Sequence, residues 1–440
     1  MFNMNPTSTI NNTRYRVLLL GGGGREHALA TAISRSPHCS ALFVAPGNPG
    51  TASIATNLDL APSNAEAVSL AIHQNQIDLV VCGPEEALVN GLADRLRDEF
   101  GHHALLFFGP GAIGARLEGS KDFSKQFMAR HSIPTARYRT FTADQLQEGL
   151  EYLRNHPLPV VLKADGLAAG KGVVICHTSE VACETLNDML IHLRFGTAGA
   201  RVVVEEFLQG IEMSAFVITD GRDYLLLPEA KDYKRVGDGD EGPNTGGMGA
   251  VSPVPFADTE FMARVEERVI RRTLLGLQAE NIPYTGFVFF GLMKVGDDPY
   301  VIEYNVRMGD PETEVVVPRI QSDLLQHMVA ACLGRIQDER IVTNPLTACT
   351  VMLVSGGYPG DYPRGLPIYG DTHQPLTYHA GTRLTADGLE LRTAGGRVLA
   401  VGALGEDLAE ARARAYERVQ GFCFEGVYYR RDIGLDLLAD

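Results

Sequence analysis

Short apolar runs alternate with amphipathic segments over the first 110 residues. The apolar runs end in glycine-rich turns, as RVLLLGGGG at 16–24, ALFVAPGNPG at 41–50, DLVVCGPEE at 78–86 and LLFFGPG at 105–111. Between them, residues 25–35 and 63–75 have the pattern of helices. Short buried strands alternating with helices are typical of a doubly wound parallel sheet. Such a sheet binds ligands beyond the carboxyl ends of its strands, where these glycine turns fall.

The pattern changes after residue 117. It predicts in turn a helix over 118–136 ended by Pro134, a hairpin over 160–175, a strand–turn–strand unit over 202–221, and a hairpin with a GDD turn within 284–312. Residues 229–250 are rich in glycine and charge, and no regular element is expected there. The last 100 residues indicate a small α+β domain. Its helix, about 406–419, would bury a face made of Leu408, Ala411, Ala415 and Val419.

Composition narrows the class of protein. A chain of 440 residues suggests about three domains. With 45% hydrophobic and 21% charged residues, it has the balance of a globular protein. No apolar run reaches the roughly 18 residues that span a bilayer, and the polar N-terminus predicts no signal peptide. The net charge of -15 argues against a nucleic-acid or membrane-surface partner.

The cysteines and histidines of the sequence indicate neither disulfide bonds nor a zinc site. The seven cysteines are scattered and form no CxxC pair, which favours reduced thiols in a cytoplasmic protein. The twelve histidines have no metal-ligand spacing, so no zinc site is predicted. Any anionic ligand must therefore be held by local cations, helix N-termini or a metal ion.

The stretch VVLKADGLAAGKGVVI, 160–175, has the glycines and lysine of a phosphate loop. It is not a Walker A loop, because Gly166 and Gly170 are too close and Gly172, not a hydroxyl residue, follows Lys171. The β-branched run after it favours a strand over a helix. Such a hairpin can fold over a nucleotide and offer backbone N–H groups and a lysine to its phosphates. An ordinary glycine-rich turn is the alternative.

The GGGGREH turn at 21–27 resembles a dinucleotide-binding turn only in its glycines. A dinucleotide fold needs an acidic residue about 20 positions on, where this chain has Val44, Ala45 and Pro46. The better interpretation is a helix N-terminus that binds a phosphate or carboxylate. A tight turn without a ligand remains open, and His27 is interpreted as a helix residue.

The segment YVIEYNVR places Glu303, Asn305 and Arg307 on one face of a predicted strand. A carboxylate and an amide oxygen suit Mg²⁺, which shares its oxygen ligands with phosphates. Arg307 could then meet a transferring phosphoryl group or an acyl phosphate. A solvated strand face is the alternative.

Two further segments could frame a nucleotide. In VVVEEFLQGIE, Leu208 and the backbone of 205–207 could hold adenine and Glu212 the ribose, although a solvated turn explains the segment equally well. Residues 229–250 combine cations, carboxylates and glycines. A long structured loop of this kind is usually functional, and a disordered surface loop is the alternative.

These motifs, in chain order, resemble the ATP-grasp superfamily of ligases. Within it they are similar to the phosphoribosylamine–glycine ligase (glycinamide ribonucleotide synthetase) family through GGGGREHALA, APGNPGT, GPEEALVNGLAD, LEGSKDFSKQFMARHSIPTA, VLKADGLAAGKGVV, VVEEFLQGIEMS, DYKRVGDGDEGPNTGGMGA and IEYNVRMGDPET. The resemblance covers about 14–435. It implies a purine-biosynthesis enzyme that joins glycine to 5-phosphoribosylamine while ATP becomes ADP and phosphate. The implied intermediate is glycyl phosphate, with no covalent enzyme nucleophile.

The resemblance also implies roles for individual residues. The ATP site would consist of Lys121, Lys163, Gly166, Gly170, Lys171, Gly172, Glu205, Leu208, Glu212, Lys231 and Lys234. The metal, Mg²⁺ or Mn²⁺, would bind Glu303 and Asn305. The catalytic residues would be Arg307, Lys163 and Asp232. Phosphoribosylamine and glycine would lie against Gly23, Gly24, Gly83, Asp232, Thr245, Gly246 and Asp310.

The implied architecture is an α/β and α+β multidomain fold. Its parts would be a flexible extension at 1–13, an N-terminal α/β domain with a doubly wound parallel sheet at 14–117, an ATP-grasp domain at 118–330 with a mobile flap at about 137–205, and a small C-terminal α+β domain at 335–440. The expected partners are the small-molecule substrates alone, without nucleic acid or membrane. The expected state is a cytoplasmic monomer or weak homodimer.

The chain departs from the family pattern in two places. Many members have a QDHKR-like segment where this chain has Lys231, Asp232, Tyr233, Lys234 and Arg235. No histidine can therefore act there, and Lys231 is expected to add a phosphate contact. Many ATP-grasp enzymes also have a carboxylate on the strand before the metal strand, and GFVFFGLMKV, 286–295, has none. A second metal-binding carboxylate would have to come from elsewhere.

Other functions remain open from the sequence. One is another ATP-grasp carboxylate–amine ligase with a different acceptor. A second is a non-catalytic nucleotide-binding protein that keeps the scaffold, which the intact face of Glu303, Asn305 and Arg307 disfavours. A third is a nicotinamide-dependent oxidoreductase, which the missing acidic residue after the second strand disfavours.

Overall fold

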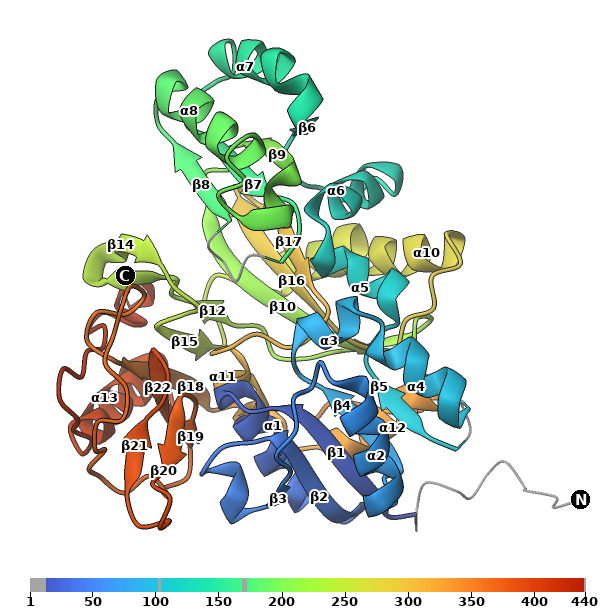
Figure 1. Cartoon of the computed structure of the whole chain (residues 1–440), viewed down its shortest axis with the longest axis vertical. Coiled ribbons are helices and arrows are strands. Elements are labelled where there is room, and N and C mark those ends of the chain that lie inside the picture. Colours follow the sequence, from blue (N-terminus) through green and yellow to red (C-terminus); the bar gives the residue numbers. More distant parts are fainter. Residues whose placement is uncertain (1–12, 102–103, 168–171, 439–440) are drawn as a thin grey trace, which may run out of the picture.

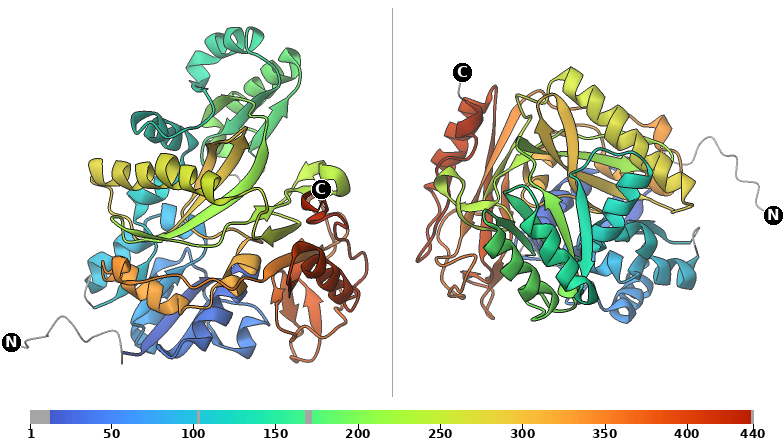
Figure 2. Two further views of the ribbon diagram at one scale, coloured as in Figure 1. Left: turned by 180° about the vertical axis from the view of Figure 1, so that it is seen from behind. Right: turned by 90° about the horizontal axis from the view of Figure 1, so that it is seen from above.

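The computed structural model of the chain describes residues 13–101, 104–167 and 172–438. Figure 1 shows an N-terminal layer at the bottom, a separate lobe at the top and the C-terminal strands at the lower left. The left view in Figure 2 shows the upper lobe standing off the rest of the molecule. Residues 1–12 of the predicted extension lie outside the described residues.

The N-terminal layer is a parallel sheet in the order β3-β2-β1-β4-β5. Its strands are β1 (Tyr15–Gly21), β2 (Cys39–Pro46), β3 (Thr56–Asn57), β4 (Leu79–Cys82) and β5 (Leu106–Phe108). The helices between them are α1 (Gly24–Arg35), α2 (Ala65–Asn75), α3 (Glu85–Val89) and α4 (Leu92–Phe100). Leu18 and Leu20 of β1 belong to one core cluster, and Val17 and Leu19 to another. Both faces are therefore covered, which confirms the predicted doubly wound sheet.

The upper lobe has a hydrophobic core of its own, built around Phe141, Leu162 and Leu186. Its antiparallel sheet has the order β6-β9-β7-β8. The elements are β6 (Tyr138–Thr142), α7 (Leu146–Arg154), β7 (Val160–Ala164), β8 (Val173–Cys176), α8 (Ser179–Leu190) and β9 (Arg201–Glu206). Lys163 is paired with Val173 across β7 and β8. The predicted strand–loop–strand arrangement of 160–175 is thus confirmed at both of its strands.

A central antiparallel sheet in the order β11-β10-β16-β17 lies below the lobe. Its strands are β10 (Ile211–Thr219), β11 (Tyr224–Leu226), β16 (Gly286–Val295) and β17 (Asp298–Asn305). The predicted strand–turn–strand of 202–221 is present, but its strands belong to different sheets, β9 to the lobe and β10 to the center. The predicted hairpin of 284–312 is β16–β17. A bulge at Ile302 lets Glu303 oppose Gly291 while Val301 opposes Leu292.

The last sheet joins segments that are far apart in the sequence, in the order β12-β15-β18-β22-β19. The strands are β12 (Lys231–Asp232), β15 (Gly249–Ser252), β18 (Thr347–Val354), β19 (Thr377–His379) and β22 (Arg397–Gly405). The hairpins β13 (Arg235–Gly237) with β14 (Glu241–Asn244) and β20 (Thr382–Leu384) with β21 (Leu391–Thr393) lie beside it. The expectation of no regular element in 229–250 was therefore wrong. Strands β13 and β14 pair with each other, β12 pairs with β15, and β15 is completed by the distant strand β18.

Helix α13 (Leu408–Val419) packs on this sheet and buries Leu408, Ala411, Ala415 and Val419, the predicted face. With the parallel sheet, the central sheet and this α+β part, the predicted fold class is confirmed.

The helix predicted over 118–136 is instead two helices, α5 (Ala112–Gly119) and α6 (Lys121–Arg130). Ser120 between them is extended, and its hydroxyl oxygen accepts the Phe123 N–H at 3.1 Å. A serine that caps the second helix cannot also continue the first. The break places Lys121 at the first position of α6, facing the lobe.

The remaining helices are α9 (Thr259–Val265), α10 (Arg271–Ala279), α11 (Thr313–Val316) and α12 (Leu324–Cys332). Within the described parts of the chain, no helix has the length and apolar character needed to cross a membrane.

Candidate active site

A buried carboxylate lies between two lysines where the lobe meets the main body. Glu205, near the end of β9, has its Oε2 atom 3.0 Å from the ammonium of Lys163 on β7 and 3.0 Å from that of Lys125 on α6. All three side chains are almost fully buried. Burial lowers the pKa of Lys125 to about 8, although Glu205 opposes the shift. Among the described residues, Glu205 Oε1 has no hydrogen-bond partner.

Glu303 on β17 lies among cations from three separate elements. Burial alone would raise its pKa, but the charges of Lys234, Lys163 and Lys121 outweigh burial and lower it. Glu303 is thus held in its ionised form. Lys121 also donates to the Gly166 backbone oxygen at 2.9 Å, which ties α6 to the start of the glycine loop. Glu303 and Asn305 both follow the bulge at Ile302, and as alternate residues of β17 they share one face.

The segment after β11 adds a second charged group. The ammonium of Lys234 is 2.9 Å from a carboxylate oxygen of Glu212 on β10. Burial opposes the charge of Lys234, but Asp232, Glu212 and Glu303 raise its pKa well above the ordinary value. Burial raises the pKa of Asp232, although Lys234 opposes the shift. Asp232, Lys234 and Glu303 therefore form one electrostatic cluster.

Arg307, just beyond β17, is held by carboxylates from the N-terminal part of the chain. It lies 2.8 Å from Glu118 of α5 and 3.3 Å from Glu85 of α3. Burial would lower the pKa of Arg307, but these acids raise it. Burial raises the pKa of Glu118 to about 7 despite the nearby arginine. The guanidinium is thereby fixed in position and always charged.

The glycines at the start of α1 allow close packing around acidic side chains. The Gly23 N–H donates to Glu26 at 2.7 Å. A side chain at Gly83 would come within 2.1 Å of Glu26, and one at Gly24 within 2.3 Å of the buried Glu314. A Cβ atom at Gly24 or Gly83 would therefore force a buried carboxylate to move.

Asp310 joins the α1 end of the site to the C-terminal strands. A carboxylate oxygen of Asp310 lies 3.0 Å from Arg397, and its other oxygen is 3.5 Å from the Arg25 N–H. Arg397 also donates to the Gly246 carbonyl at 2.7 Å. The Thr245 hydroxyl donates to the Lys234 carbonyl at 2.8 Å, so this group continues into the Lys234 cluster.

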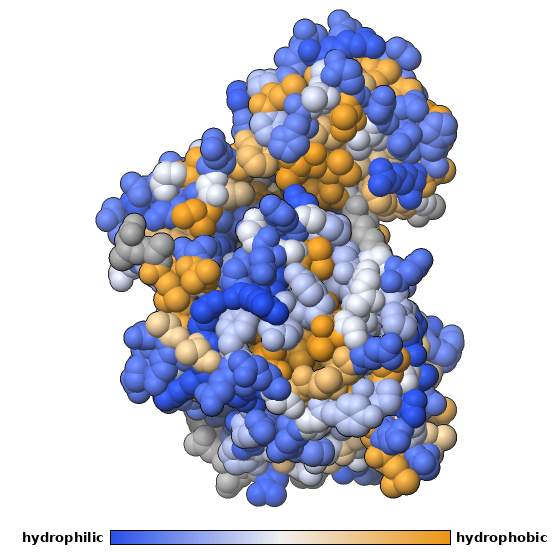
Figure 3. All heavy atoms as spheres, turned by 90° about the vertical axis from the view of Figure 1, so that its left-hand side faces the viewer, coloured by the Kyte–Doolittle hydropathy of each residue, from blue (hydrophilic) through white to orange (hydrophobic). Residues whose placement is uncertain are grey.

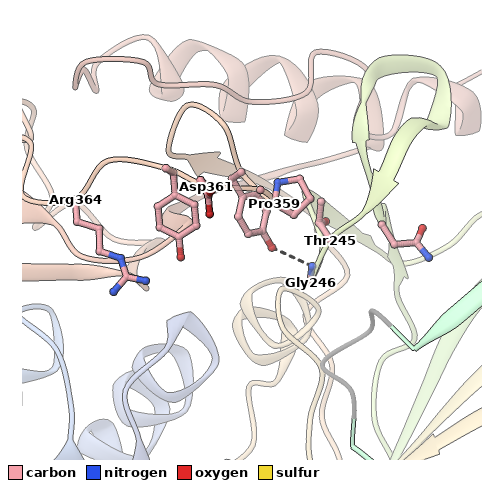
Figure 4. A pocket seen from close by; sticks show the side chains of 9 residues that line it. Thr245, Gly246, Pro359, Asp361 and Arg364 are labelled. Atoms are coloured by element: carbon pink, nitrogen blue, oxygen red, sulfur yellow. Dashed lines mark hydrogen bonds between the residues drawn. The ribbon is translucent and has the colours of Figure 1, made fainter. Parts of the chain in front are cut away.

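An open pocket of about 360 Å³ lies next to this group (Figure 4). Its wall is formed by Asn244, Thr245, Gly246, Tyr358, Pro359, Gly360, Asp361, Tyr362 and Arg364. The Tyr358 hydroxyl accepts the Gly246 N–H at 3.1 Å, the bond drawn as a dashed line in Figure 4. In the side view of Figure 3, hydrophilic and hydrophobic residues both line the hollowed face below the upper lobe.

The structure brings most of the predicted site residues together. Lys121, Lys163, Glu205, Lys234 and Glu303 adjoin one another through the contacts above. Leu208 is half-buried in the link between β9 and β10. Gly166 and Gly172 are at the two ends of the glycine loop, whereas Gly170 and Lys171 lie outside the described residues.

Lys231 is placed differently from the other predicted phosphate contacts. Its ammonium pairs with Asp436 near the C-terminus and lies 4.5 Å from the centre of the Tyr233 ring.

Sequence reasoning missed several residues of the site. Lys125 and Glu118 sit on α6 and α5, where charged side chains are common on exposed faces. The signal for them was their spacing of three and four residues from Lys121 within the helix predicted over 118–136. Arg397 and Tyr358 lie far along the chain, and nothing local connects them to Asp310 or Gly246.

The oxygen donors fit a metal shared with phosphate. Within the described residues, no group of three or more His, Cys, Asp or Glu side chains could hold a metal ion by itself. Glu303 and Asn305 provide a carboxylate that stays ionised and an amide oxygen, which are ligands that Mg²⁺ accepts. Such a pair leaves the other coordination positions to water and phosphate oxygens.

The chain matches three domain families along its length. They are described as phosphoribosylglycinamide synthetase N domain at residues 15–118, ATP-grasp (A) domain at 119–313 and C domain at 348–436. A protein of Yersinia pestis named phosphoribosylamine–glycine ligase is 44% identical over 430 residues, covering 96% of this chain and 99% of that protein.

Solved structures agree with this match. The crystal structure of phosphoribosylamine–glycine ligase from Thermotoga maritima has a TM-score of 0.84 at 37% identity, with 95% of this chain and 100% of that chain covered. The biotin carboxylase domain of a Hydrogenobacter thermophilus 2-oxoglutarate carboxylase has a TM-score of 0.70 at 17% identity, covering 94% and 92%. The latter shows a shared fold alone.

Proposed function

The chain belongs to the phosphoribosylglycinamide synthetase family, and we propose that it joins glycine to 5-phosphoribosylamine, giving glycinamide ribonucleotide while ATP becomes ADP and phosphate. The family resemblance of the sequence motifs is thereby confirmed, and the chain is an ATP-grasp ligase. Its biological role is a step of purine biosynthesis. The proposal places the enzyme in the cytoplasm as a monomer or weak homodimer.

One observation carries the proposal for the ATP site. Lys121, Lys163 and Lys234 come from α6, the lobe and the segment after β12, and all of them act on the ionised Glu303. Such a group suits a triphosphate with its metal ion, because the lysines can pair with the phosphates and the carboxylate with the metal. A bound Mg²⁺ or Mn²⁺ would neutralise phosphate charge, and Glu303 and Asn305 would hold it.

The nucleoside would lie at the link between the lobe and the central sheet. Glu205 Oε1 is buried and has no partner among the described residues, although buried acceptors are nearly always hydrogen-bonded. The exocyclic amine of adenine is a suitable donor for it. Leu208 would provide an apolar contact, and Glu212 would bind the ribose after exchanging its bond with Lys234. The glycine loop that contains Gly166, Gly170, Lys171 and Gly172 would cover the phosphates.

The reaction would proceed through two transfers. In the first, a carboxylate oxygen of glycine attacks the γ-phosphorus, the bond from that phosphorus to the β–γ bridging oxygen breaks, and ADP leaves. Arg307, fixed by Glu118 and Glu85, would stabilise the charge on the phosphoryl group. Lys163 would neutralise charge on the phosphates before and after transfer.

In the second transfer, the amine of phosphoribosylamine attacks the carbonyl carbon of glycyl phosphate, and the carbon–oxygen bond to phosphate breaks. The amine must lose a proton. Asp232 is a suitable acceptor because burial raises its pKa. The amine and glycine would lie between Asp232 and the group formed by Gly23, Gly24, Gly83 and Asp310. Thr245 and Gly246 would border the phosphoribosyl end, next to the pocket of Figure 4.

The test is ADP release from ATP, Mg²⁺ and glycine, measured with and without freshly generated phosphoribosylamine. We expect ADP to form only, or far faster, with both substrates, together with the mass of glycinamide ribonucleotide. ATP turnover that does not depend on phosphoribosylamine would mean a different acceptor. A chain that does not bind ATP would contradict the ATP site itself.

A further inference from the structure

Side chains of the segment from Lys231 to Lys234 point alternately toward the C-terminal segment and toward the active site. The Lys231 ammonium and the Tyr233 hydroxyl both bond to Asp436, the hydroxyl at 2.5 Å. Asp232 and Lys234 face the other way, toward Glu212 and Glu303. Alternate residues of an extended segment point to opposite sides, so a shift on one side moves the other.

The segment that carries Asp436 is itself held firmly. Arg430, whose side chain is 1% exposed, bonds to Asp432 at 2.7 Å and to Asp240 at 2.6 Å. Ile433 is fully buried, and a side chain at Gly249 of β15 would come within 2.9 Å of it. Residues 430–433 are therefore anchored by buried contacts close in the chain to Asp436, whose own side chain is 47% exposed.

Lys231 needs the carboxylate that Asp436 provides. The Lys231 side chain is only 11% exposed, and a buried ammonium without a partner is costly. Asp436 is also the hydrogen-bond acceptor of the Tyr233 hydroxyl, so one carboxylate holds two alternate side chains of the segment. Both of these contacts lie on the side of the segment away from Asp232 and Lys234.

We propose that Asp436 is a positioning residue, which acts through Lys231 and Tyr233 to fix Asp232 and Lys234 in the active site. The inference rests on the proposed function, because its effect is measured on that reaction. It assigns Lys231 to this contact and not to the ATP phosphates. The residues that touch substrate remain Asp232 and Lys234.

The experiment uses the full chain and compares Asp436→Asn, Asp436→Glu and Lys231→Met, together with the double variant Lys231→Met/Asp436→Asn. The readout is kcat and KM for phosphoribosylamine-dependent ADP release, with the melting temperature measured in parallel. Asp387→Asn, in the exposed turn between β20 and β21, is the matched carboxylate-to-amide control and should equal the wild type.

We expect Asp436→Asn to lower kcat about tenfold with a melting temperature within about 3 °C of the wild type. Asp436→Glu should restore most of the rate. The double variant should be little slower than Lys231→Met alone, because the ammonium contact is already lost and the amide oxygen of Asp436→Asn can still accept from the Tyr233 hydroxyl.

Several results would overturn the inference. One is an Asp436→Asn variant with wild-type kcat, including one that only melts earlier. Another is a double variant that loses a further factor of about ten. A third is a rise in the KM for ATP in Lys231→Met but not in Asp436→Asn, which would return Lys231 to the phosphates. Failure of the proposed function is distinguishable, because the wild type itself would then lack phosphoribosylamine-dependent ADP release.

Discussion

At the scale of single residues, Glu205 is the point where two lysines share one negative charge. Lys125 and Lys163 are equally close to it, yet only Lys163 also lies among the cations that surround Glu303. Lys163 should therefore contact ATP, and Lys125 should mainly hold the Glu205 carboxylate in place.

We expect Lys163→Met to lower kcat about 100-fold, because a phosphate contact is lost in a buried site. The free energy of unfolding should fall by only about 1 kcal/mol, since Lys125 still neutralises Glu205. The measurements are ADP release and urea unfolding.

The matched variant is Lys125→Met, at the same distance from the same carboxylate. It should unfold at a urea concentration similar to that of Lys163→Met and keep substantially more activity. Equal activity in Lys163→Met and the wild type would contradict the phosphate assignment.

Glu303 allows a separate test of the metal site. In Glu303→Gln the oxygen remains but the negative charge is lost, so three lysines are left without their shared counter-charge. We expect the Mg²⁺ concentration for half-maximal activity to rise at least about tenfold. The measurement is an activity titration with Mg²⁺ at saturating ATP and glycine.

The control is Glu267→Gln, an exposed residue in the helical stretch between α9 and α10. It should leave the metal requirement unchanged. An unchanged requirement in Glu303→Gln would place the metal elsewhere.

At the scale of elements, the sequence predicted those structures whose causes are local. The buried face of α13 and the glycine hairpin follow from periodicity and β-branched residues, and both are present. The two helices around Ser120 were merged, because a single capping serine is a weak signal inside a helical pattern. Of the short strands in 229–252, β15 was missed because its partner β18 lies about a hundred residues later, and β12 pairs in turn with β15. Strands β13 and β14 pair with each other, in a segment whose glycines and charges hide the strand pattern.

The residues of the candidate site likewise include some that a local pattern predicts and others that only tertiary packing brings together. Glu303 and Asn305 could be chosen from alternation along one strand, and the family pattern supplied Lys163 and Asp310. Arg397 and Asp436 could not be found, because each is brought to the site only by the tertiary packing of the C-terminal strands.

The pocket of Figure 4 makes a prediction at this scale, because it is formed by two separate segments, 244–246 and 358–364. If the phosphoribosyl phosphate lies there, Arg364 is the cation in its wall that would meet it. Arg364→Ala should then raise the KM for phosphoribosylamine about tenfold with little change in kcat. The measurement is initial rate against phosphoribosylamine concentration.

Arg222→Ala, in the exposed turn between β10 and β11, is the control and should keep the wild-type KM. A wild-type KM in Arg364→Ala would place the phosphate outside this pocket.

At the scale of the whole molecule, two buried histidines join the N-terminal and C-terminal parts of the chain. The backbone N–H of His379 in β19 donates to Nδ1 of His27 in α1 at 2.9 Å. Burial lowers the pKa of His27 to about 3 and that of His379 to about 4. His27 is thus a structural residue of its helix, in line with its interpretation from the sequence.

The lowered pKa values of these two histidines predict that the folded chain loses stability in acid. The unfolded chain binds protons at these histidines below about pH 6.5, whereas the folded chain does not until about pH 3 to 4. Stability is therefore fully present above pH 6.5 and is lost as the pH falls, by about 2 kcal/mol per histidine at pH 5. Urea unfolding at pH 7.5 and pH 5 measures the loss.

His379→Gln should reduce the difference between the free energies of unfolding at pH 7.5 and pH 5. The control His192→Gln, at an exposed position, should leave that difference unchanged. A loss in His379→Gln as large as that in the wild type would assign the acid sensitivity to other groups.

The C-terminal sheet limits where the chain can be truncated, because it contains β12 and β15 from the middle of the chain as well as β18, β22 and β19. Strand β15 takes its pairing from β18 in one fixed register, Gly249 opposite Val351 and Ser252 opposite Ala348. A chain cut before residue 347 would expose that row of N–H and carbonyl groups to any other strand, and it should self-associate. The C-terminal unit is consequently not a removable module. Another unit could replace it in a fusion or during evolution only by bringing a strand of the same direction and register.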